Sequence, residues 1–263
     1  MSPLALFGIG LLLTGLVMAL VFAAALRLRN FSIVDVAWSA NFTPLVLLYA
    51  ALAGGYWARR ALIAGMVTLW SLRLAAHLHA RVSALHPEEE GRYVQLRREW
   101  AASLNGRFFA FFQAQGLLNA VLSVPFLVAC VDRRRPLGGF EIAGATLFAV
   151  ALAGEAVADR QLASFKADPA NRGRTCRAGP WRYSRHPNYF FEWLVWLAYF
   201  VFALPSPWGW TSVACPLLML FFLFRVTGIP MTEEQALRSR GDDYREYQRT
   251  TSAFFPWWHR IGR

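Results

Sequence analysis

The stretch "PLALFGIGLLLTGLVMALVFAAALR", residues 3–27, contains no charged residue before Arg27. About 20 apolar residues in a helix are enough to cross the hydrocarbon core of a bilayer, because each residue advances the helix by about 1.5 Å. The stretch is too long and too poorly delimited for a cleaved signal peptide. We therefore interpret it as a membrane-spanning helix, and this decides the class of fold.

Six further apolar segments follow, at approximately residues 33–53, 61–80, 108–130, 138–157, 190–207 and 209–228. Each is expected to be helical, because backbone groups left unpaired in lipid are too costly. The chain of 263 residues is 56% hydrophobic, with a mean hydropathy of +0.34. A soluble protein with unusually apolar helices would not repeat such runs from end to end. The sequence predicts an all-α, polytopic membrane protein with about seven transmembrane helices.

The distribution of cations predicts the orientation of these helices. If the N-terminus lies outside, 21 of the 27 Lys and Arg residues fall in connections on the inner side and five on the outer side, with Arg73 inside a span. The positive-inside rule then places the C-terminus in the cytosol. The three sizeable cytosolic pieces are residues 81–107, 158–189 and 229–263.

The formal net charge of +11 would suggest nucleic-acid binding in a soluble protein. In a membrane protein the same charge follows from the positive-inside bias and from contact with anionic headgroups, so we expect membrane lipids and no nucleic acid as partners. Cys130, Cys176 and Cys215 have no paired spacing, which indicates neither a disulfide framework nor a zinc site. The Arg-rich and Ala-rich composition suggests a bacterial source, hence the bacterial inner membrane.

Ionisable residues at membrane depth are site candidates, because they are costly unless paired or in contact with water. Asp35 and Trp38, three residues apart, share one helix face, and Arg73 and His77, four apart, share another. Glu141 lies near a helix start, where a carboxylate suits the helix dipole, and we discount it. A structural alternative is that Asp35 and Arg73 pair and lock two helices together.

A second polar group lies where the fifth and sixth spans meet the cytosol. Glu155 and Asp159 are four residues apart, Lys166 follows, and Glu192 comes four residues after Asn188. Each residue alone would fit a solvated helix end, but three carboxylates, an amide and nearby cations together favour a binding site.

Several motifs resemble one membrane-enzyme superfamily. They are "RYSRHPNYFFEW" (182–193), the tail "TEEQALRSRGDDYREYQRTTSAFFPW" (232–257), "IVDVAWS" (33–39), "LWSLRLAAHLHAR" (69–81) and "EGRYVQLRREW" (90–100). Together they resemble the steroid 5-alpha-reductase superfamily, and most closely its bacterial membrane proteins of the DUF1295 type. The Arg-His-Pro-Asn-Tyr block is shared with the isoprenylcysteine carboxyl methyltransferases.

The resemblance implies a seven-helix reductase whose C-terminal half binds NADPH. It implies one membrane domain, 1–263, in which residues 1–137 hold the substrate and residues 138–263, with loop 158–189 and tail 229–263, bind the cofactor. Hydride would pass to the β-carbon of an enone in a steroid-like or other lipid substrate, and an acid would act on the carbonyl oxygen. The implied cofactor-binding residues are Glu155, Asp159, Lys166, Arg174, Tyr183, Arg185, His186, Asn188, Tyr189, Glu192, Arg225, Glu233, Tyr244 and Tyr247.

The substrate half departs from the family pattern. The reductases use a Gln-Glu pair and a tyrosine to hold the substrate carbonyl, and the corresponding segments here contain neither. The available catalytic substitutes are Asp35, Trp38, His77 and Tyr93, which the sequence alone does not rank. The tail reads "TGIPMTEE" where the steroid enzymes have a histidine-rich stretch, which puts steroid specificity in doubt.

The alternative function is an S-adenosylmethionine-dependent methyltransferase. NADPH carries roughly four negative charges, which Arg side chains suit, whereas S-adenosylmethionine is a sulfonium without phosphate. The run of cations between Arg160 and Glu192, with only Asp168 as an acid, favours the dinucleotide. Glu233 and Glu234 resemble the acidic pair of the methyltransferase tail.

Other site types are weaker. No G-x-G-x-x-G with the required context occurs, so a Rossmann fold is not expected. His77 and His79 lie on different helix faces, and we predict no metal site. A non-catalytic lipid-binding protein is a third possibility.

Overall fold

The computed structural model describes residues 1–226 and 228–258. Within these residues the chain is helical and contains no strand beyond one isolated bridge between Ser184 and Ser252. The chain forms two compact units, one of residues 1–141 and 203–211 and the other of residues 142–202 and 212–263. Among the described residues, six helical stretches are long and apolar enough to cross a membrane, at 3–28, 33–52, 57–85, 101–131, 139–167 and 209–240. These stretches confirm the prediction of an all-α, multi-pass membrane protein.

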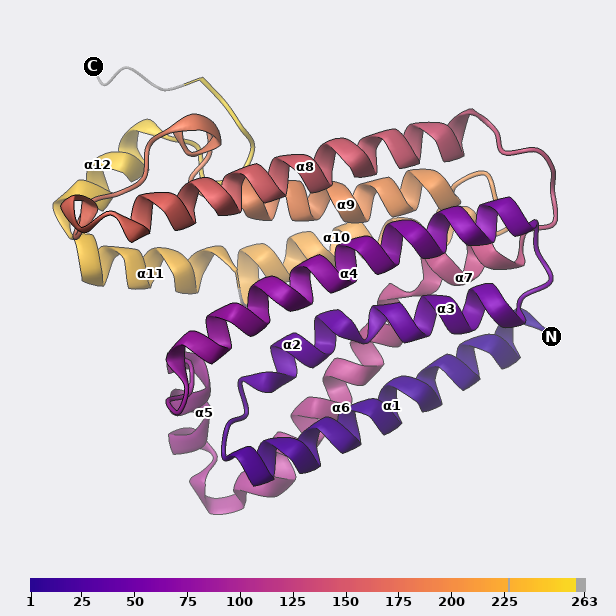
Figure 1. Ribbon diagram of the computed structural model, residues 1–263, viewed down its shortest axis with the longest axis horizontal. Coiled ribbons are helices and arrows are strands. Elements are labelled where there is room, and N and C mark those ends of the chain that lie inside the picture. Colours follow the sequence, from indigo (N-terminus) through magenta and orange to yellow (C-terminus); the bar gives the residue numbers. More distant parts are fainter. Residues whose placement is uncertain (227, 259–263) are drawn as a thin grey trace. The chain divides into compact units, whose positions relative to one another are not determined.

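The helices of the first unit are α1 (Pro3–Leu28), α2 (Ile33–Ala40), α3 (Phe42–Leu52), α4 (Trp57–Leu85), α5 (Gly91–Glu99), α6 (Leu104–Leu122) and α7 (Val124–Val131). Helix α1 packs along α6, and α2 and α3 pack along α4 (Figure 1). One aromatic core cluster, built around Phe31, Phe108 and Phe112, joins these helices near α5. The short helix α5 is thereby held against the ends of α1, α2 and α6.

The helices of the second unit are α8 (Gly139–Ala167, from residue 142 onward), α9 (Pro187–Ala203, up to residue 202), α10 (Ala214–Phe221), α11 (Ile229–Arg240) and α12 (Asp242–Thr250). A π-helical turn, Phe222–Val226, follows α10. The predicted sixth span, 190–207, forms α9, which has 17 residues. The total of about seven crossings and the orientation in the membrane remain predictions.

The predicted second span is broken into α2 and α3 at Asn41. Pro44 has no N–H to bond the carbonyl four residues earlier, that of Ala40, so the helix cannot continue unchanged. Side chains of neighbouring helices donate to backbone carbonyls on the N-terminal side of the break. Ser71 Oγ donates to Ser39 O at 2.6 Å, and Asn119 Nδ2 donates to Trp38 O at 3.1 Å. Side chains of α4 and α6 thus donate hydrogen bonds to the backbone carbonyls of the broken helix. Lipid has no donor that could do so.

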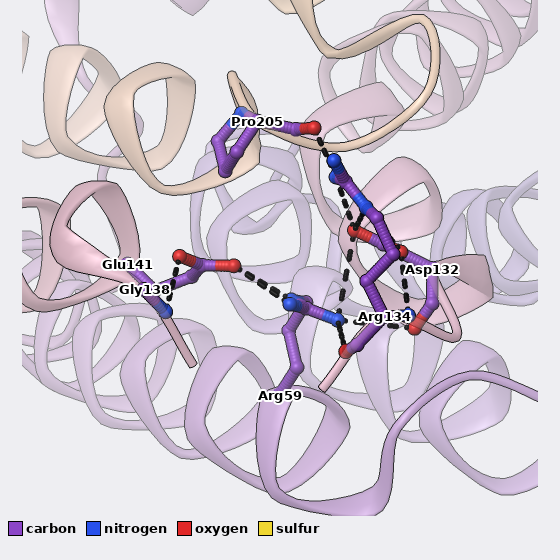
Figure 2. Close-up of polar contacts among 6 residues, drawn as sticks. All are labelled: Arg59, Asp132, Arg134, Gly138, Glu141 and Pro205. Atoms are coloured by element: carbon purple, nitrogen blue, oxygen red, sulfur yellow. Dashed lines mark hydrogen bonds and ion pairs between the residues drawn. The ribbon is translucent and has the colours of Figure 1, made fainter. Parts of the chain in front are cut away.

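A buried ion cluster lies at the N-terminal end of α4, around Arg59. Arg59 Nε and Nη2 donate to Glu141 Oε1 at 2.9 and 2.8 Å, and Arg59 Nη1 donates to the carbonyls of Asp132 and Arg134 (Figure 2). Asp132 also pairs with Arg134, whose Nη2 donates to Pro205 O. The assignment of Glu141 to the helix dipole alone was therefore incomplete, because its carboxylate also neutralises a buried arginine.

Helix α8 extends ten residues beyond the end of the predicted fifth span, 138–157, and ends at Ala167. Its close packing on α9 is made possible by glycines. A Cβ on Gly144 would lie 2.8 Å from Phe202 Cβ and 2.9 Å from Ala198 O. Because α8 continues to Ala167, Glu155 and Asp159 lie inside this helix, about three turns and two turns before its end.

Candidate functional site

Two segments of the first unit, the α1–α2 connection and the α4–α5 connection, interlock and bring α5 to α2. Phe31 N donates to Glu89 Oε1 at 2.6 Å, and Glu90 N donates to Ser32 Oγ at 3.0 Å. Glu89 also accepts two bonds from Arg97, whose guanidinium lies over the Phe31 ring at 4.8 Å. These contacts fix the position of α5 relative to the first turn of α2.

Asp35 and Tyr93, two of the predicted catalytic residues, are in direct contact as a result. Tyr93 Oη donates to Asp35 Oδ1 at 2.6 Å, and the Tyr93 side chain is fully buried. Burial, together with the adjacent Asp35 carboxylate, raises the pKa of Tyr93 well above its ordinary value. Arg81 Nη2 lies 3.8 Å from Asp35 Oδ2 and binds Glu90 through Nε at 2.6 Å. The pair therefore holds a proton beside a buried aromatic cluster and a half-exposed arginine.

Trp38 and His77 are placed differently. Trp38 lies one turn after Asp35 on α2, is half-buried and packs against the same core cluster as Tyr93. His77 lies on α4 and is exposed. Asp35 and Tyr93 are thus in direct hydrogen-bond contact, and Trp38 is connected to Tyr93 by packing against the same cluster. A role for His77 stays a prediction.

The second unit contains a polar cavity of about 570 Å³ at the C-terminal end of α8. It is formed by the last turns of α8, the turn that follows it, and α11. Four cations line it: Lys166, Arg172, Arg174 and Arg240. The carboxylate in the lining is Asp168, whose Oδ1 caps the next turn by accepting from Ala170 N at 2.9 Å. We call this cavity the basic pocket.

Lys166 and Arg174 of the basic pocket were predicted from the sequence, whereas Arg172 and Arg240 were not. Arg240 comes from the tail, 66 residues after Arg174 in the chain, and only the fold of α11 against α8 brings it there. The guanidinium of Arg240 also lies over the Tyr244 ring, 4.9 Å from its centroid. The signal that was available in the sequence is the unbalanced run of cations after α8.

Two predicted residues, Arg185 and His186, both contact a third, Glu233. Arg185 Nε donates to Glu233 Oε1 at 2.7 Å, and His186 Nε2 lies 3.2 Å from the same oxygen. Arg185 Nη1 also donates to Gln248 O and Thr251 O, at 3.0 and 2.7 Å. We call these contacts the Arg185–Glu233 interlock. They connect the segment before α9 to α11 and to the end of α12, and so hold the tail in place. Cofactor binding by these residues stays a prediction.

The predicted tyrosines support the same region. Tyr247 Oη donates to Trp181 O and to Ser184 O, the latter at 3.1 Å, and burial raises its pKa far above the ordinary value. Burial and the nearby Glu233 also raise the pKa of Tyr244. Tyr189 stacks on His186 with ring centroids 5.3 Å apart, and its hydroxyl lies 3.1 Å from Thr232 Oγ1, in the lining of the basic pocket. Tyr183 lies in the same segment and is half-buried.

The remaining predicted residues lie along α8, α9 and the π-helical turn. Glu155 on α8 and Glu192 on α9 are both buried. Trp196 Nε1 donates to Glu192 Oε1 at 3.0 Å. Asp159 and Asn188 are half-buried, and Arg225 is exposed on the π-helical turn, a geometry that often marks functional sites.

A family model described as "Protein of unknown function (DUF1295)" matches residues 21–251, which include both the Asp35–Tyr93 pair and the basic pocket. The chain belongs to the DUF1295 family. This DUF1295 chain is also 27% identical to an uncharacterized protein of the fission yeast Schizosaccharomyces pombe, over 95% of this chain and 79% of the relative. No solved structure matches it. This relative is eukaryotic, so the bacterial source suggested by composition stays a prediction.

Proposed function

We propose that this DUF1295 protein is an NADPH-dependent membrane reductase of a C=C bond conjugated to a carbonyl in a lipid-like substrate. The proposal includes membership of the steroid 5-alpha-reductase superfamily, and location in the bacterial inner membrane if the source is bacterial. The observation that carries it is the basic pocket. Its chemistry distinguishes a phosphorylated cofactor from one without phosphate.

The positive charge of the basic pocket matches the negative charge of the phosphate groups of a dinucleotide. Among residues 1–226 and 228–258, no ion pair joins Arg172, Arg174 or Arg240 to a carboxylate. Arginine forks bind phosphate oxygens in a bidentate manner, and a phosphate would satisfy donors that the protein itself leaves to solvent. S-adenosylmethionine, a sulfonium, would meet like charge here.

The basic pocket also fits in size and neighbourhood. Its volume of about 570 Å³ lies within the usual range of ligand pockets, roughly 300–1,000 Å³. Thr232 and Gln235 of α11 add neutral polar groups to the lining. The hydroxyl of Tyr189, whose ring stacks on His186, lies 3.1 Å from Thr232 Oγ1 in this lining. Phosphate would bind the cations, and the neutral groups would contact ribose or amide.

When bound, NADPH would supply a hydride to the β-carbon of the enone. Residues of the chain would then stabilise the negative charge that develops on the substrate carbonyl oxygen. In the Asp35–Tyr93 pair, the single hydroxyl proton of Tyr93, which is donated to Asp35 Oδ1, would turn to the carbonyl oxygen as a hydrogen bond while the hydride adds. The α-carbon of the resulting enolate would then take a proton from water, which completes the addition of two hydrogens across the C=C bond. The raised pKa of Tyr93 keeps its hydroxyl protonated at neutral pH, so the group polarises the carbonyl rather than ionising.

Ligand titration tests the cofactor. We expect the purified protein in detergent to bind NADPH and to be stabilised by it thermally, and S-adenosylmethionine to have no effect. Arg240→Gln should weaken NADPH binding about 10- to 100-fold, because a hydrogen bond to a charged group contributes about 1.5–3 kcal/mol. Arg238→Gln is the matched control, since Arg238 lies on the same helix, is 77% exposed and pairs with Glu234. Binding of S-adenosylmethionine alone would overturn the reductase proposal.

A second measurement tests the acid. Tyr93→Phe removes the hydroxyl and keeps the ring, so NADPH affinity should be unchanged while reduction of an enone substrate slows by roughly 10²–10⁴-fold. Asp35→Asn should slow reduction as well, because it changes the partner that orients the phenol. Full activity of both variants would remove the pair from the reaction.

A further inference from the structure

The last described segment, residues 252–258, runs along the segment that precedes α9, and we call it the C-terminal strap. Arg185 N donates to Ser252 O at 2.8 Å, and Trp257 N donates to Tyr183 O at 3.0 Å. Between these two bonds, Ser184 Oγ donates to Phe254 O at 2.8 Å. The strap is therefore held in one register by three hydrogen bonds.

This register divides the aromatic side chains of the strap into two sets. Phe254 is 2% exposed and packs against Phe190, Trp193 and Phe224, with ring centroids 5.2–6.0 Å apart. Three other side chains remain outside: Phe255 is 54% exposed, Trp257 66% and Trp258 77%. Such exposure of three neighbouring large aromatic groups is unfavourable in water.

The exposed set lies where two apolar segments reach the predicted cytosolic face. The ring of Phe255 packs against the rings of Phe190 and Trp193, in the first two turns of α9, with centroids 6.0 and 5.9 Å apart. Phe224, which contacts Phe254, lies on the π-helical turn at the end of the last apolar segment and is 39% exposed. The exposed aromatic surface of the strap is thus continuous with the apolar surfaces of the helices that meet lipid.

Two exposed arginines border the strap. Arg182 precedes Tyr183 in the chain, and Arg225 follows Phe224. Within the described ranges, no ion pair joins either of them to a carboxylate. Their positive charge matches the anionic headgroups of a cytoplasmic leaflet, where each such residue strengthens partitioning by about fivefold.

We propose that the C-terminal strap is a membrane-interface anchor, in which Phe255, Trp257 and Trp258 enter the boundary between headgroups and acyl chains, and Arg182 and Arg225 bind anionic phospholipid headgroups. Trp and Phe favour this level of the bilayer because their rings are apolar and large, and the indole N–H can bond to headgroup oxygens. The strap would then tie the Arg185–Glu233 interlock to the membrane surface. This inference does not depend on which cofactor the protein binds.

A fluorescent label tests the depth of the strap. Cys130, Cys176 and Cys215 are buried, so a thiol introduced by Trp258→Cys can be labelled selectively with an environment-sensitive dye. The full chain would be placed in nanodiscs of phosphatidylcholine with phosphatidylglycerol, with and without lipids brominated near the headgroup end of the acyl chains. Asp242→Cys is the control, because Asp242 lies on α12 of the same unit and its side chain is 92% exposed.

The proposal expects bromine to quench the dye at position 258 and not at position 242. Quenching should be weaker in phosphatidylcholine alone, and Arg182→Gln with Arg225→Gln should abolish that dependence on lipid charge. Equal water access at the two positions would overturn the proposal. So would shielding of position 258 from iodide without bromine quenching, since protein, such as a second copy of the chain, would then cover the strap. Thermal unfolding in detergent checks that each labelled variant keeps the fold.

Discussion

Replacing Arg59 by methionine is the sharpest test of how the first unit is held together. The side chain of Arg59 is 2% exposed and donates two hydrogen bonds to Glu141 and one each to the carbonyls of Asp132 and Arg134. Arg59→Met would leave the Glu141 carboxylate buried, with the bond from Gly138 N to its other oxygen remaining. Breaking a buried pair on one side destabilises by about 3–5 kcal/mol, because an uncompensated charge remains.

The free energy of unfolding can be measured in mixed micelles by circular dichroism at increasing denaturant. We expect Arg59→Met to lose about 3–5 kcal/mol and Arg59→Lys to lose less, since lysine keeps the charge but not the planar fork. Arg133→Met is the matched control, because Arg133 is an exposed arginine in the adjoining loop and its loss should change stability by less than about 0.5 kcal/mol.

A double-mutant cycle separates loss of the pair from loss of packing. Arg59→Met combined with Glu141→Met removes both charges, so it should be less destabilised than Arg59→Met alone. The reasoning is refuted if Arg59→Met behaves like Arg133→Met. It is also refuted if the second substitution adds fully to the first, because the two groups would then not interact.

Three further outcomes are expected in the second unit. Gly144→Ala should destabilise by about 1–3 kcal/mol in the same unfolding assay, because its Cβ would clash with Phe202, while Gly139→Ala on the same helix meets nothing within 4 Å and should be neutral. Tyr247→Phe should cost about 1–3 kcal/mol of unfolding free energy, because the carbonyls of Trp181 and Ser184 lose a buried donor; an unchanged midpoint would contradict this. The pKa of Tyr247 is raised above its unfolded value of 10.0, so the stability it contributes is full below about pH 10 and is lost as pH rises further, because the unfolded state releases its proton first. A pH series of unfolding midpoints should show this loss, and Tyr247→Phe should show less of it.

The fold class could be predicted from the sequence because it depends on local composition. An apolar run such as residues 3–27 must be helical in lipid wherever its neighbours lie, since only a helix pairs the backbone groups within one segment. The breaks at Asn41 and Ser123 were not predicted, although Pro44 and Pro125 follow them. A proline weakens a helix locally, but whether the helix breaks depends on donors from other helices, such as Ser71.

The candidate site was predictable in its residue types and only partly in its grouping. Asp35 was singled out because a carboxylate at membrane depth is costly, and that cost does not depend on the partner. That its partner is Tyr93, 58 residues later, follows from the interlock of the α1–α2 and α4–α5 connections. Likewise, the run of cations after α8 was visible in the sequence, while the contribution of Arg240 to the basic pocket depends on the packing of α11.

What the sequence determined by itself is therefore the class of the protein and which residues are chemically conspicuous: apolar runs, buried charges and unbalanced cations act through their own solvation free energy. What only the tertiary structure decided is how these residues are paired. Glu141 with Arg59, Asp35 with Tyr93, and Arg185 with Glu233 are separated by 82, 58 and 48 residues, and such contacts depend on how whole helices pack. Hydrogen bonds and ion pairs act only over a few ångströms, so no pattern along the chain reveals them until the helices have been brought together.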